Sequence, residues 1–164
     1  MAAQTSEKSP WADKFVAPTV DQIRGHYNRQ TAQLFDSARE VLGSLPGLAE
    51  SIAWQGVPWR WTLVYSVESE GTQGGVRAWA YIVPDPQRLQ VCVPLSGAML
   101  AAMPVKRFKK WVRDGIVFAR SVGGVCWPTW EIATREHMED VADIIRRKHR
   151  QTVAPVDQAH AVGA

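Results

Sequence analysis

The sequence predicts an α+β fold, in which an antiparallel sheet of about five strands carries helices packed on one face. Three observations lead to this prediction. Apolar residues recur at helical spacing near the start and near the end of the chain. Between these stretches, four segments alternate apolar and polar residues, and short turns join them, which is typical of an antiparallel meander. The expected order is therefore a helix, a four-strand meander, a helix, a strand and a helix.

The first helix is expected after Thr19. Thr19 and Gln22 have the spacing of a capping box, in which each side chain bonds the backbone of the other residue. Apolar residues follow at helical spacing as far as Leu42, so the pattern predicts one long amphipathic helix with a bend allowed at Gly25. Residues 43–47 end this helix, because glycine accepts a left-handed cap and proline cannot continue the helical hydrogen bonds.

Four strands are expected next, at residues 48–55, 59–67, 76–83 and 88–95. The second has the clearest alternation, with tryptophan, leucine, tyrosine and valine on one side and mostly polar residues on the other. The glycine-rich residues 68–75 are expected to form the loop of a hairpin. Residues 84–87 (Pro-Asp-Pro-Gln) are expected to form a turn, because proline presets the turn dihedral and aspartate can bond its own backbone.

A second helix and a fifth strand are expected after the meander. Pro104 suits the first turn of a helix whose apolar stripe continues to Ala119. Residues 122–124 (Val-Gly-Gly) break this helix. Residues 125–132 form the strand, and Pro128 places it at a sheet edge or a bulge, because proline lacks the N–H that a sheet ladder uses.

The last helix is expected to begin after the capping residue Thr134 and to end near Arg150. Residues 1–18 and 151–164 show no periodicity, so we predict disordered ends around a single domain that spans residues 19–150. Three residues of the N-terminal stretch could nevertheless dock on that domain, namely Trp11, Phe15 and Val16.

Composition limits the function classes. A formal net charge of +3 is too small to require a polyanionic partner. No apolar run approaches the roughly 18 residues of a membrane span, so no membrane partner is expected. Cys92 and Cys126 stand apart in apolar surroundings, and no secretory segment is visible, so we expect reduced thiols and a cytoplasmic location.

Motifs of the common enzyme classes are missing from the sequence: a Walker-type loop, G-x-G-x-x-G, G-x-S-x-G and H-E-x-x-H. We therefore favour a binding or accessory module over an enzyme, and no motif identifies a cofactor. The histidines are interpreted as surface residues, because none has a cysteine or a second histidine at the spacing of metal ligands. These histidines are His26, His137, His149 and His160.

The segment from Leu45 to Pro58 resembles the signature of the YdhG-like group of small bacterial domains: a proline, an acidic residue, isoleucine, an aromatic residue and a second proline. Residues 81–84 (Tyr-Ile-Val-Pro), the closing strand and the helix ending at Lys148 are similar to a related group of bacterial domains with the same order of elements. The resemblance covers residues 20–148 and implies that fold. Some YdhG-like members are described as frataxin-like iron chaperones, which would imply an acidic metal-handling surface, whereas this chain is basic overall.

The first candidate site is an aromatic patch that contains arginine. Three of the eight tryptophans lie within residues 53–61, around a glycine and a proline. Strand alternation places Arg77, Trp79 and Tyr81 on one face of the third strand. In the second strand it places Arg60 on the face opposite the tryptophans. If both sets lie on the same side of the sheet, they could hold a planar or anionic small molecule.

The residues predicted to bind this ligand are Trp54, Arg60, Arg77, Trp79 and Tyr81. Cys92 and Glu131 could border the same site, although we interpret Cys92 as a buried thiol, because no motif gives it a base. Two alternatives remain open. The aromatic residues could belong to the core, or their face could pair two copies of the chain in a homodimer, since aromatic residues and arginine are enriched at interfaces.

A second candidate is a nucleic-acid surface on the second main helix. Its basic residues could neutralise phosphates while exposed aromatic residues stack on bases. They are Lys106, Arg107, Lys109, Lys110 and Arg113, joined by Arg146, Arg147, Lys148 and Arg150 at the end of the last helix. We favour the alternative that these residues form the solvated outer faces of amphipathic helices.

A third candidate is a metal site on the last helix. Four acidic residues share one face there, and the predicted ligands of iron or another hard cation are Glu136, Asp140 and Asp143, with Glu139 beside them. We favour a solvated face here too. Asp143 and Arg147 have the spacing of a helical ion pair, and an open helix face rarely offers the roughly six oxygen ligands that such a cation requires.

Overall fold

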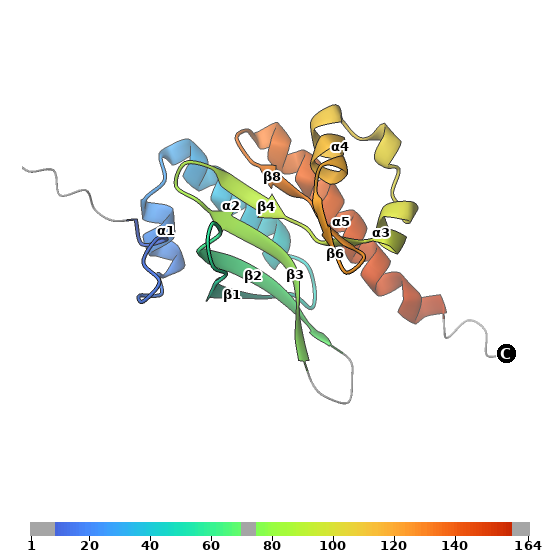
Figure 1. The fold of residues 1–164 in the computed structure, drawn as a ribbon, viewed down its shortest axis with the longest axis horizontal. Coiled ribbons are helices and arrows are strands. Elements are labelled where there is room, and N and C mark those ends of the chain that lie inside the picture. The colour runs from blue at the N-terminus through green and yellow to red at the C-terminus, as the bar shows by residue number, and fades with distance from the viewer. Residues whose placement is uncertain (1–8, 70–74, 159–164) are drawn as a thin grey trace, which may run out of the picture.

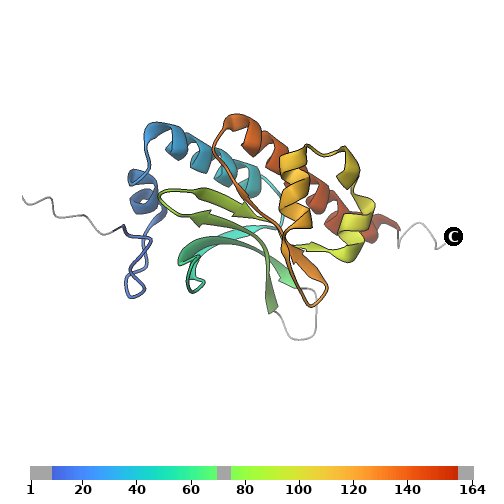
Figure 2. The same cartoon turned by 45° about the horizontal axis from the view of Figure 1, so that its top comes forward.

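The computed structural model describes residues 9–69 and 75–158 of the chain. Within these residues, a layer of helices covers one face of a five-stranded sheet, and the opposite face of the sheet carries no helix (Figure 2). The predicted α+β class, with helices packed on one face of an antiparallel sheet, is confirmed.

The elements follow one another along the chain as Figure 1 shows. The helices are α1 (Val20–Gly25), α2 (Arg29–Gly43), α3 (Gly97–Ala102), α4 (Lys110–Val117) and α5 (Arg135–Gln158), with a 3-10 turn (Val105–Arg107) before α4. The strands are β1 (Ala49–Trp54), β2 (Trp61–Ser69), β3 (Gly75–Pro84), β4 (Leu89–Cys92), β5 (Leu95–Ser96), β6 (Arg120–Val122), β7 (Val125–Trp127) and β8 (Thr129–Glu131). Among the residues described, no helix has the length and apolar character needed to cross a membrane.

Strands β1 to β4 form the predicted antiparallel meander. Strand β8 joins it beside β4, so the order across the larger sheet is β1-β2-β3-β4-β8. A smaller sheet has the order β5-β7-β6. The turn between β3 and β4 uses the expected aspartate, since the Asp85 carboxylate accepts a hydrogen bond of 2.9 Å from the backbone N–H of Gln87.

The main core lies between the larger sheet and the helices α2 and α5. It is built by the inner face of the sheet and by the apolar stripes of the two helices. Its fully buried members include Phe35 and Leu42 from α2, Leu63 and Ile82 from the sheet, and Val141 and Ile145 from α5. Burial of each such side chain contributes ~1.5–3 kcal/mol relative to exposure, so this packing fixes the position of both helices on the sheet.

The predicted long first helix is instead two helices. The capping box of Thr19 and Gln22 forms as expected at the start of α1, but α1 ends at Gly25. A new helix begins after Asn28, whose side chain accepts a hydrogen bond of 2.8 Å from the backbone N–H of Thr31. An asparagine side chain is among the best N-caps, and here it starts a second helix within an uninterrupted apolar pattern.

The predicted fifth strand is divided by Pro128. Its first part, β7, pairs with β5 and β6 in the small sheet, and its second part, β8, pairs with β4 at the edge of the larger sheet. Proline cannot donate to a ladder, although its carbonyl accepts a hydrogen bond of 3.2 Å from Val93. The predicted edge position is confirmed for β8, whereas β7 is the central strand of the small sheet.

The predicted second helix is shorter than expected. The chain forms a 3-10 turn after Pro104, and α4 ends at Val117 rather than continuing to Ala119. The residues expected to break the helix form a hairpin between β6 and β7. Gly123 and Gly124 have φ angles of 58° and 77°, the left-handed pair that a tight two-residue hairpin turn requires.

The two ends of the domain also differ from the prediction. Helix α5 is capped by Thr134 as expected but continues to Gln158, well beyond Arg150. In the N-terminal stretch, the indole N–H of Trp11 donates to the carbonyl of Trp59 at 3.1 Å. The other two predicted docking residues, Phe15 and Val16, are exposed. The remaining predicted disordered residues, 1–8 and 159–164, and loop residues 70–74 lie outside the described part of the chain.

Candidate functional site

A β-bulge in β3 divides the predicted aromatic patch between the two faces of the sheet. Tyr65 pairs with Ala80, and the next residue of β2 pairs with Ala78, which leaves Trp79 as the extra residue. Trp79 belongs to the core on the helix side, whereas Tyr81 belongs to a separate cluster on the other face. The prediction that both side chains share a face is therefore wrong, because the extra residue interrupts the alternation.

Tyr81 lies in a small aromatic cluster on the face without helices. Its ring centroid is 5.1 Å from that of Trp59 and 5.8 Å from that of Trp127, and only 6% of the residue is exposed. Cys92 lies beneath this cluster, and burial raises the pKa of its thiol to about 11, so the thiol is protonated at neutral pH. This face packs its own aromatic residues, and the predicted pairing of two copies through it stays a prediction.

Trp54 and Arg60 lie near the N-terminal stretch. Trp54 packs edge-on against Trp61 with a centroid distance of 5.7 Å. The guanidinium of Arg60 lies 5.0 Å from the ring centroid of Trp11. Of the five predicted ligand-binding residues, the structure therefore brings only Arg77 and Trp79 together in one cavity.

This cavity, which we call the Lys148 cavity, lies between β3, the β4–β5 connection, α3 and α5. Its volume is about 90 Å³, and it is lined by Val67, Arg77, Ala78, Trp79, Pro94, Ser96, Met99, Val125, Lys148 and Thr152. One water molecule requires ~15 Å³ by the same kind of measure, so the cavity has room for a ligand of a few non-hydrogen atoms. None of these lining residues is acidic.

Lys148 is buried in the wall of the cavity, with only 5% of the residue exposed. Its ammonium Nζ donates a hydrogen bond of 2.7 Å to the carbonyl of Trp79 and lies 4.6 Å from the centroid of the Trp79 ring. Burial, and then the positive charge of Arg77, lower the pKa of Lys148 to about 7. Among the residues described, Lys148 makes no ion pair that would favour its charged form. Because its pKa is about 7, the neutral amine is well populated at neutral pH.

Trp79 lines the cavity with its ring, and its indole nitrogen is enclosed within the fold. Its indole Nε1 is buried and has no acceptor within the described part of the chain. A buried donor without a partner costs ~1–3 kcal/mol. Because this nitrogen exposes almost no surface, Trp79 offers the cavity an apolar ring rather than a donor that a ligand could reach. The two hydroxyl groups of the cavity are already used in local hydrogen bonds: Ser96 accepts from the backbone of Met99, and Thr152 donates to the backbone of Lys148. The cavity thus favours a ligand that brings acceptors or negative charge.

The sequence prediction places Lys148 among the exposed basic residues at the end of the last helix. Its helical spacing from buried residues could have shown that Lys148 is buried as well. Val141, Ile144 and Ile145 are buried, and Lys148 follows them at seven, four and three positions, on the same stripe of α5. The register of the helix therefore turns Lys148 toward the sheet, while its neighbour Arg146 is exposed.

Three of the four main basic residues of the predicted nucleic-acid surface already contact acidic side chains or a backbone carbonyl. Lys109 contacts Glu136 at 2.5 Å and Asp140 at 3.1 Å, and Lys110 contacts Asp114 at 2.6 Å. Arg113 donates to the backbone carbonyl of Lys106 at 3.3 Å. These contacts reduce the free positive charge that the basic stripe could offer to phosphates.

The predicted metal ligands form ion pairs with lysine and arginine side chains. Glu136 and Asp140 share Lys109, and Arg147 donates to Asp143 at 2.8 Å. Asp140 also accepts a hydrogen bond from the indole of Trp111. Within residues 9–69 and 75–158, no three histidine, cysteine or acidic side chains gather as a metal site would require.

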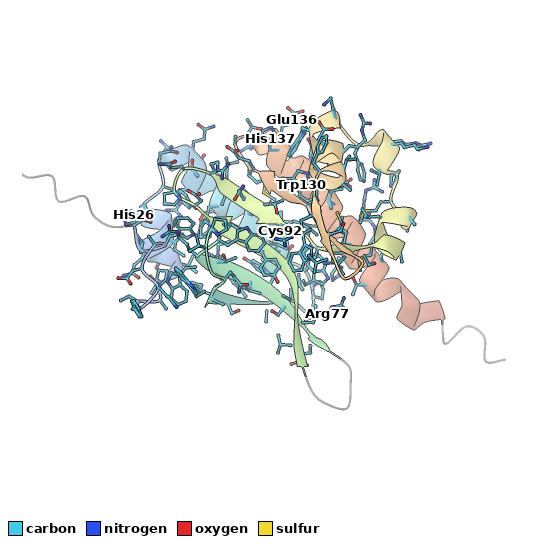
Figure 3. The ribbon with its side chains drawn as sticks, viewed as in Figure 1. His26, Arg77, Cys92, Trp130, Glu136 and His137 are labelled. Carbon is cyan, nitrogen blue, oxygen red and sulfur yellow. The ribbon has the colours of Figure 1, made fainter. Side chains whose placement is uncertain are left out.

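The histidines do not gather either. Figure 3 shows His137 beside Glu136 at the start of α5, and His26, which follows the end of α1, far from both and from Arg77. His137 accepts a hydrogen bond from the backbone of Ala133, and His149 contacts the carbonyl of Pro46 at 3.2 Å. His160 lies outside the described residues.

Comparisons with protein-family models, with curated proteins and with solved structures found no match to this chain. The resemblance to YdhG-like domains thus stays a prediction. What points to a function is the chemistry of the Lys148 cavity itself.

Proposed function

We propose that this chain is a binding module that holds the anionic group of a small molecule in the Lys148 cavity. One observation carries the proposal: a buried lysine, with no acidic partner among the described residues, lines a cavity that an arginine also lines. Proteins ordinarily bury charged groups only when these are paired. A bound anion would supply the missing partner.

The proposal keeps the predicted class of ligand but moves the site. Arg77 and Trp79 remain, Lys148 is added, and the other three predicted residues lie elsewhere. The guanidinium of Arg77 suits a carboxylate or phosphate, because its donors match two oxygens at once. The ring of Trp79 supplies an apolar wall, so one planar or short-chain anion can contact all three side chains.

Binding of an anion should be coupled to protonation of Lys148. A negative charge close to the amine favours its ammonium form and therefore raises its pKa from about 7. The protein should then take up a fraction of a proton when the ligand binds near neutral pH. This coupling distinguishes the Lys148 cavity from a surface patch of arginine residues, which stay charged throughout.

A cytoplasmic location and the fold-level resemblance to YdhG-like domains belong to the same proposal. Cys92 and Cys126 are both free and buried, which supports a reducing compartment. The four-strand meander, with helices before and after it, supports the resemblance, which expected a single helix at each of those places. Neither feature identifies the ligand, for which the cavity is the better guide.

The test is isothermal titration calorimetry of the full chain with acetate and with inorganic phosphate, repeated in two buffers of different ionisation enthalpy. We expect at least one anion to bind with proton uptake. Lys148→Met should weaken that binding at least about tenfold, equivalent to ~1.4 kcal/mol. Lys106→Met is the matched control, because it removes an exposed lysine that lies outside the cavity.

Native mass spectrometry of the purified chain complements the titration, since a tightly held small molecule would co-purify. Equal binding by the wild type and Lys148→Met would place the anion elsewhere and overturn the proposal. Absence of both a co-purified mass and any anion binding at millimolar concentration would overturn it as well.

A further inference from the structure

We propose that Lys148 forms a reversible imine with a small carbonyl compound that carries a carboxylate, such as a 2-oxo acid, held in the Lys148 cavity. This inference rests on the proposed function, because the cavity must first hold the anionic group of the ligand. It adds a covalent step and a class of ligand that binding alone does not imply.

The surroundings of Lys148 favour a nucleophilic amine. Two conditions make a lysine nucleophilic in proteins: removal from water and a neighbouring positive charge. Lys148 meets the first because it is buried, and Arg77, which lines the same cavity, supplies the second. The amine donates one hydrogen bond to the carbonyl of Trp79, and a neutral amine that donates keeps its lone pair for attack.

The cavity also selects the carbonyl compound. Its volume of about 90 Å³ restricts the ligand to a few non-hydrogen atoms. Arg77 provides the paired donors that a carboxylate prefers. Val67, Met99 and Val125 form apolar walls that suit a short carbon chain.

The step balances without a further reactant. The nitrogen lone pair of Lys148 forms a bond to the carbonyl carbon, and the carbonyl oxygen becomes the hydroxyl of a carbinolamine. The nitrogen then forms a second bond to the same carbon while the C–O bond breaks. The oxygen leaves as water with the two protons that the amine has lost, and no atom is oxidised or reduced.

The experiment incubates the full chain with pyruvate, reduces it with borohydride and locates the adduct by intact-mass and peptide mass spectrometry. Reduction turns the imine into a stable secondary amine. We expect one adduct, at Lys148, whereas lysines outside the cavity react more slowly because exposed lysines are protonated at neutral pH. Lys148→Met should lose this adduct, and Lys148→Arg, which keeps a positive charge, should lose it too.

A second variant tests recognition of the carboxylate. Arg77→Met should lower the yield of the pyruvate adduct at least about tenfold. The same variant should have a smaller effect on the adduct with acetone, which lacks a carboxylate. Comparing the two ketones cancels the change that loss of Arg77 makes to the reactivity of Lys148 itself.

The pH profile provides a readout that a merely structural lysine would not give. The titratable and charged groups that influence Lys148 are Arg77 on β3 and Cys92 on β4, and the ring of His149 lies edge-on to Trp79 at a centroid distance of 6.3 Å. Because the pKa of Lys148 is lowered to about 7, its adduct yield should rise most steeply around neutral pH. Labelling of exposed lysines should continue to rise to higher pH.

The outcomes separate this inference from the proposed function. If pyruvate or another anion binds in calorimetry but no adduct forms at Lys148, the imine is overturned while the binding function stands. Adducts spread equally over the surface lysines would also overturn the imine. If no anion binds and no adduct forms, both proposals fail.

Discussion

Burial and the positive charge of Arg77 together determine the protonation of the Lys148 amine. Transfer of an ammonium group from water into a protein interior costs several kcal/mol, unless the group is paired or becomes neutral. Here no acid pairs with it among the described residues, and the pKa is lowered to about 7, so the protein relieves the cost by releasing the proton. The same property makes the residue sensitive to pH and to bound anions.

The first prediction concerns stability and pH. The ordinary pKa of lysine is 10.5, and in the folded chain that of Lys148 is about 7. Between these values the unfolded chain binds a proton that the folded chain does not, so the free energy of unfolding rises with pH. Relative to Lys148→Met, the wild type should gain up to ~1.4 kcal/mol per pH unit across this window. Chemical denaturation of both proteins at about pH 6, 7.5 and 9 measures the difference, and a difference independent of pH would contradict the lowered pKa.

The second prediction concerns Gly115, which lies on α4 against Trp130 (Figure 3 labels Trp130). A Cβ atom at Gly115 would lie 2.2 Å from the indole Nε1 of Trp130, which donates to the carbonyl of Val112. Gly115→Ala should therefore destabilise the fold by ~1–3 kcal/mol through overpacking. The control is Gly43→Ala, where a Cβ meets nothing within 4 Å and a gain of up to ~1 kcal/mol is expected. Equal unfolding free energies for the two variants would show that Trp130 moves aside without cost.

At the scale of elements, single side chains decide where helices and strands begin and end. Asn28 starts α2 within a continuous apolar pattern, and Pro128 divides one predicted strand between two sheets. The extra residue Trp79 reverses the alternation of β3. The bulge at Trp79 places Trp79 and Tyr81 on opposite faces of the sheet and so separates Tyr81 from the cavity.

The third prediction tests the helix start at Asn28. Asn28→Ala removes the acceptor of the 2.8 Å hydrogen bond from the backbone of Thr31, so we expect a loss of about 1 kcal/mol in the free energy of unfolding. Asn28→Asp keeps a capping oxygen and should retain most of the stability. Urea denaturation compares the three proteins. Equal losses in both variants would mean that the cap does not stabilise α2.

At the scale of the whole molecule, the N-terminal stretch is fastened to the sheet by two indole groups. Trp11 donates to the carbonyl of Trp59, and Trp61 donates to the carbonyl of Asp13 at 2.6 Å. The stretch lies beside α1 at one end of the domain (Figure 1), away from the Lys148 cavity. Its attachment and the cavity should therefore respond independently to mutation.

The fourth prediction concerns the attachment of the N-terminal stretch, which lies away from the Lys148 cavity. Trp11→Phe removes the indole N–H but keeps an aromatic ring, so the N-terminal stretch should open more readily while the core remains folded. Hydrogen exchange measured by mass spectrometry should become faster in residues 9–16 and stay unchanged in α5. Unchanged exchange in residues 9–16 would show that Trp61 alone holds the stretch.

The sequence by itself determined the fold class, the four-strand meander, the capping residues Thr19 and Thr134 and the edge position of the strand after Pro128. These features depend on periodicity and on local backbone chemistry, which a short window of sequence contains. One local signal, Asn28, was also present in the sequence but was outweighed by the longer apolar pattern around it. The glycine pair Gly123-Gly124, predicted to break a helix, instead forms a hairpin turn after the helix has ended at Val117.

Only the tertiary structure decided the candidate site. Whether Trp79 lies with Tyr81 depends on one extra residue in the pairing of β2 with β3, and strand alternation in a single segment cannot reveal it. The burial of Lys148 depends on which stripe of α5 meets the sheet. Its pKa is lowered first by that burial and then by Arg77, more than 70 positions away in the chain. A site that joins β3 to α5 exists only after packing has brought the two together, because desolvation and electrostatic interaction act through space rather than along the chain.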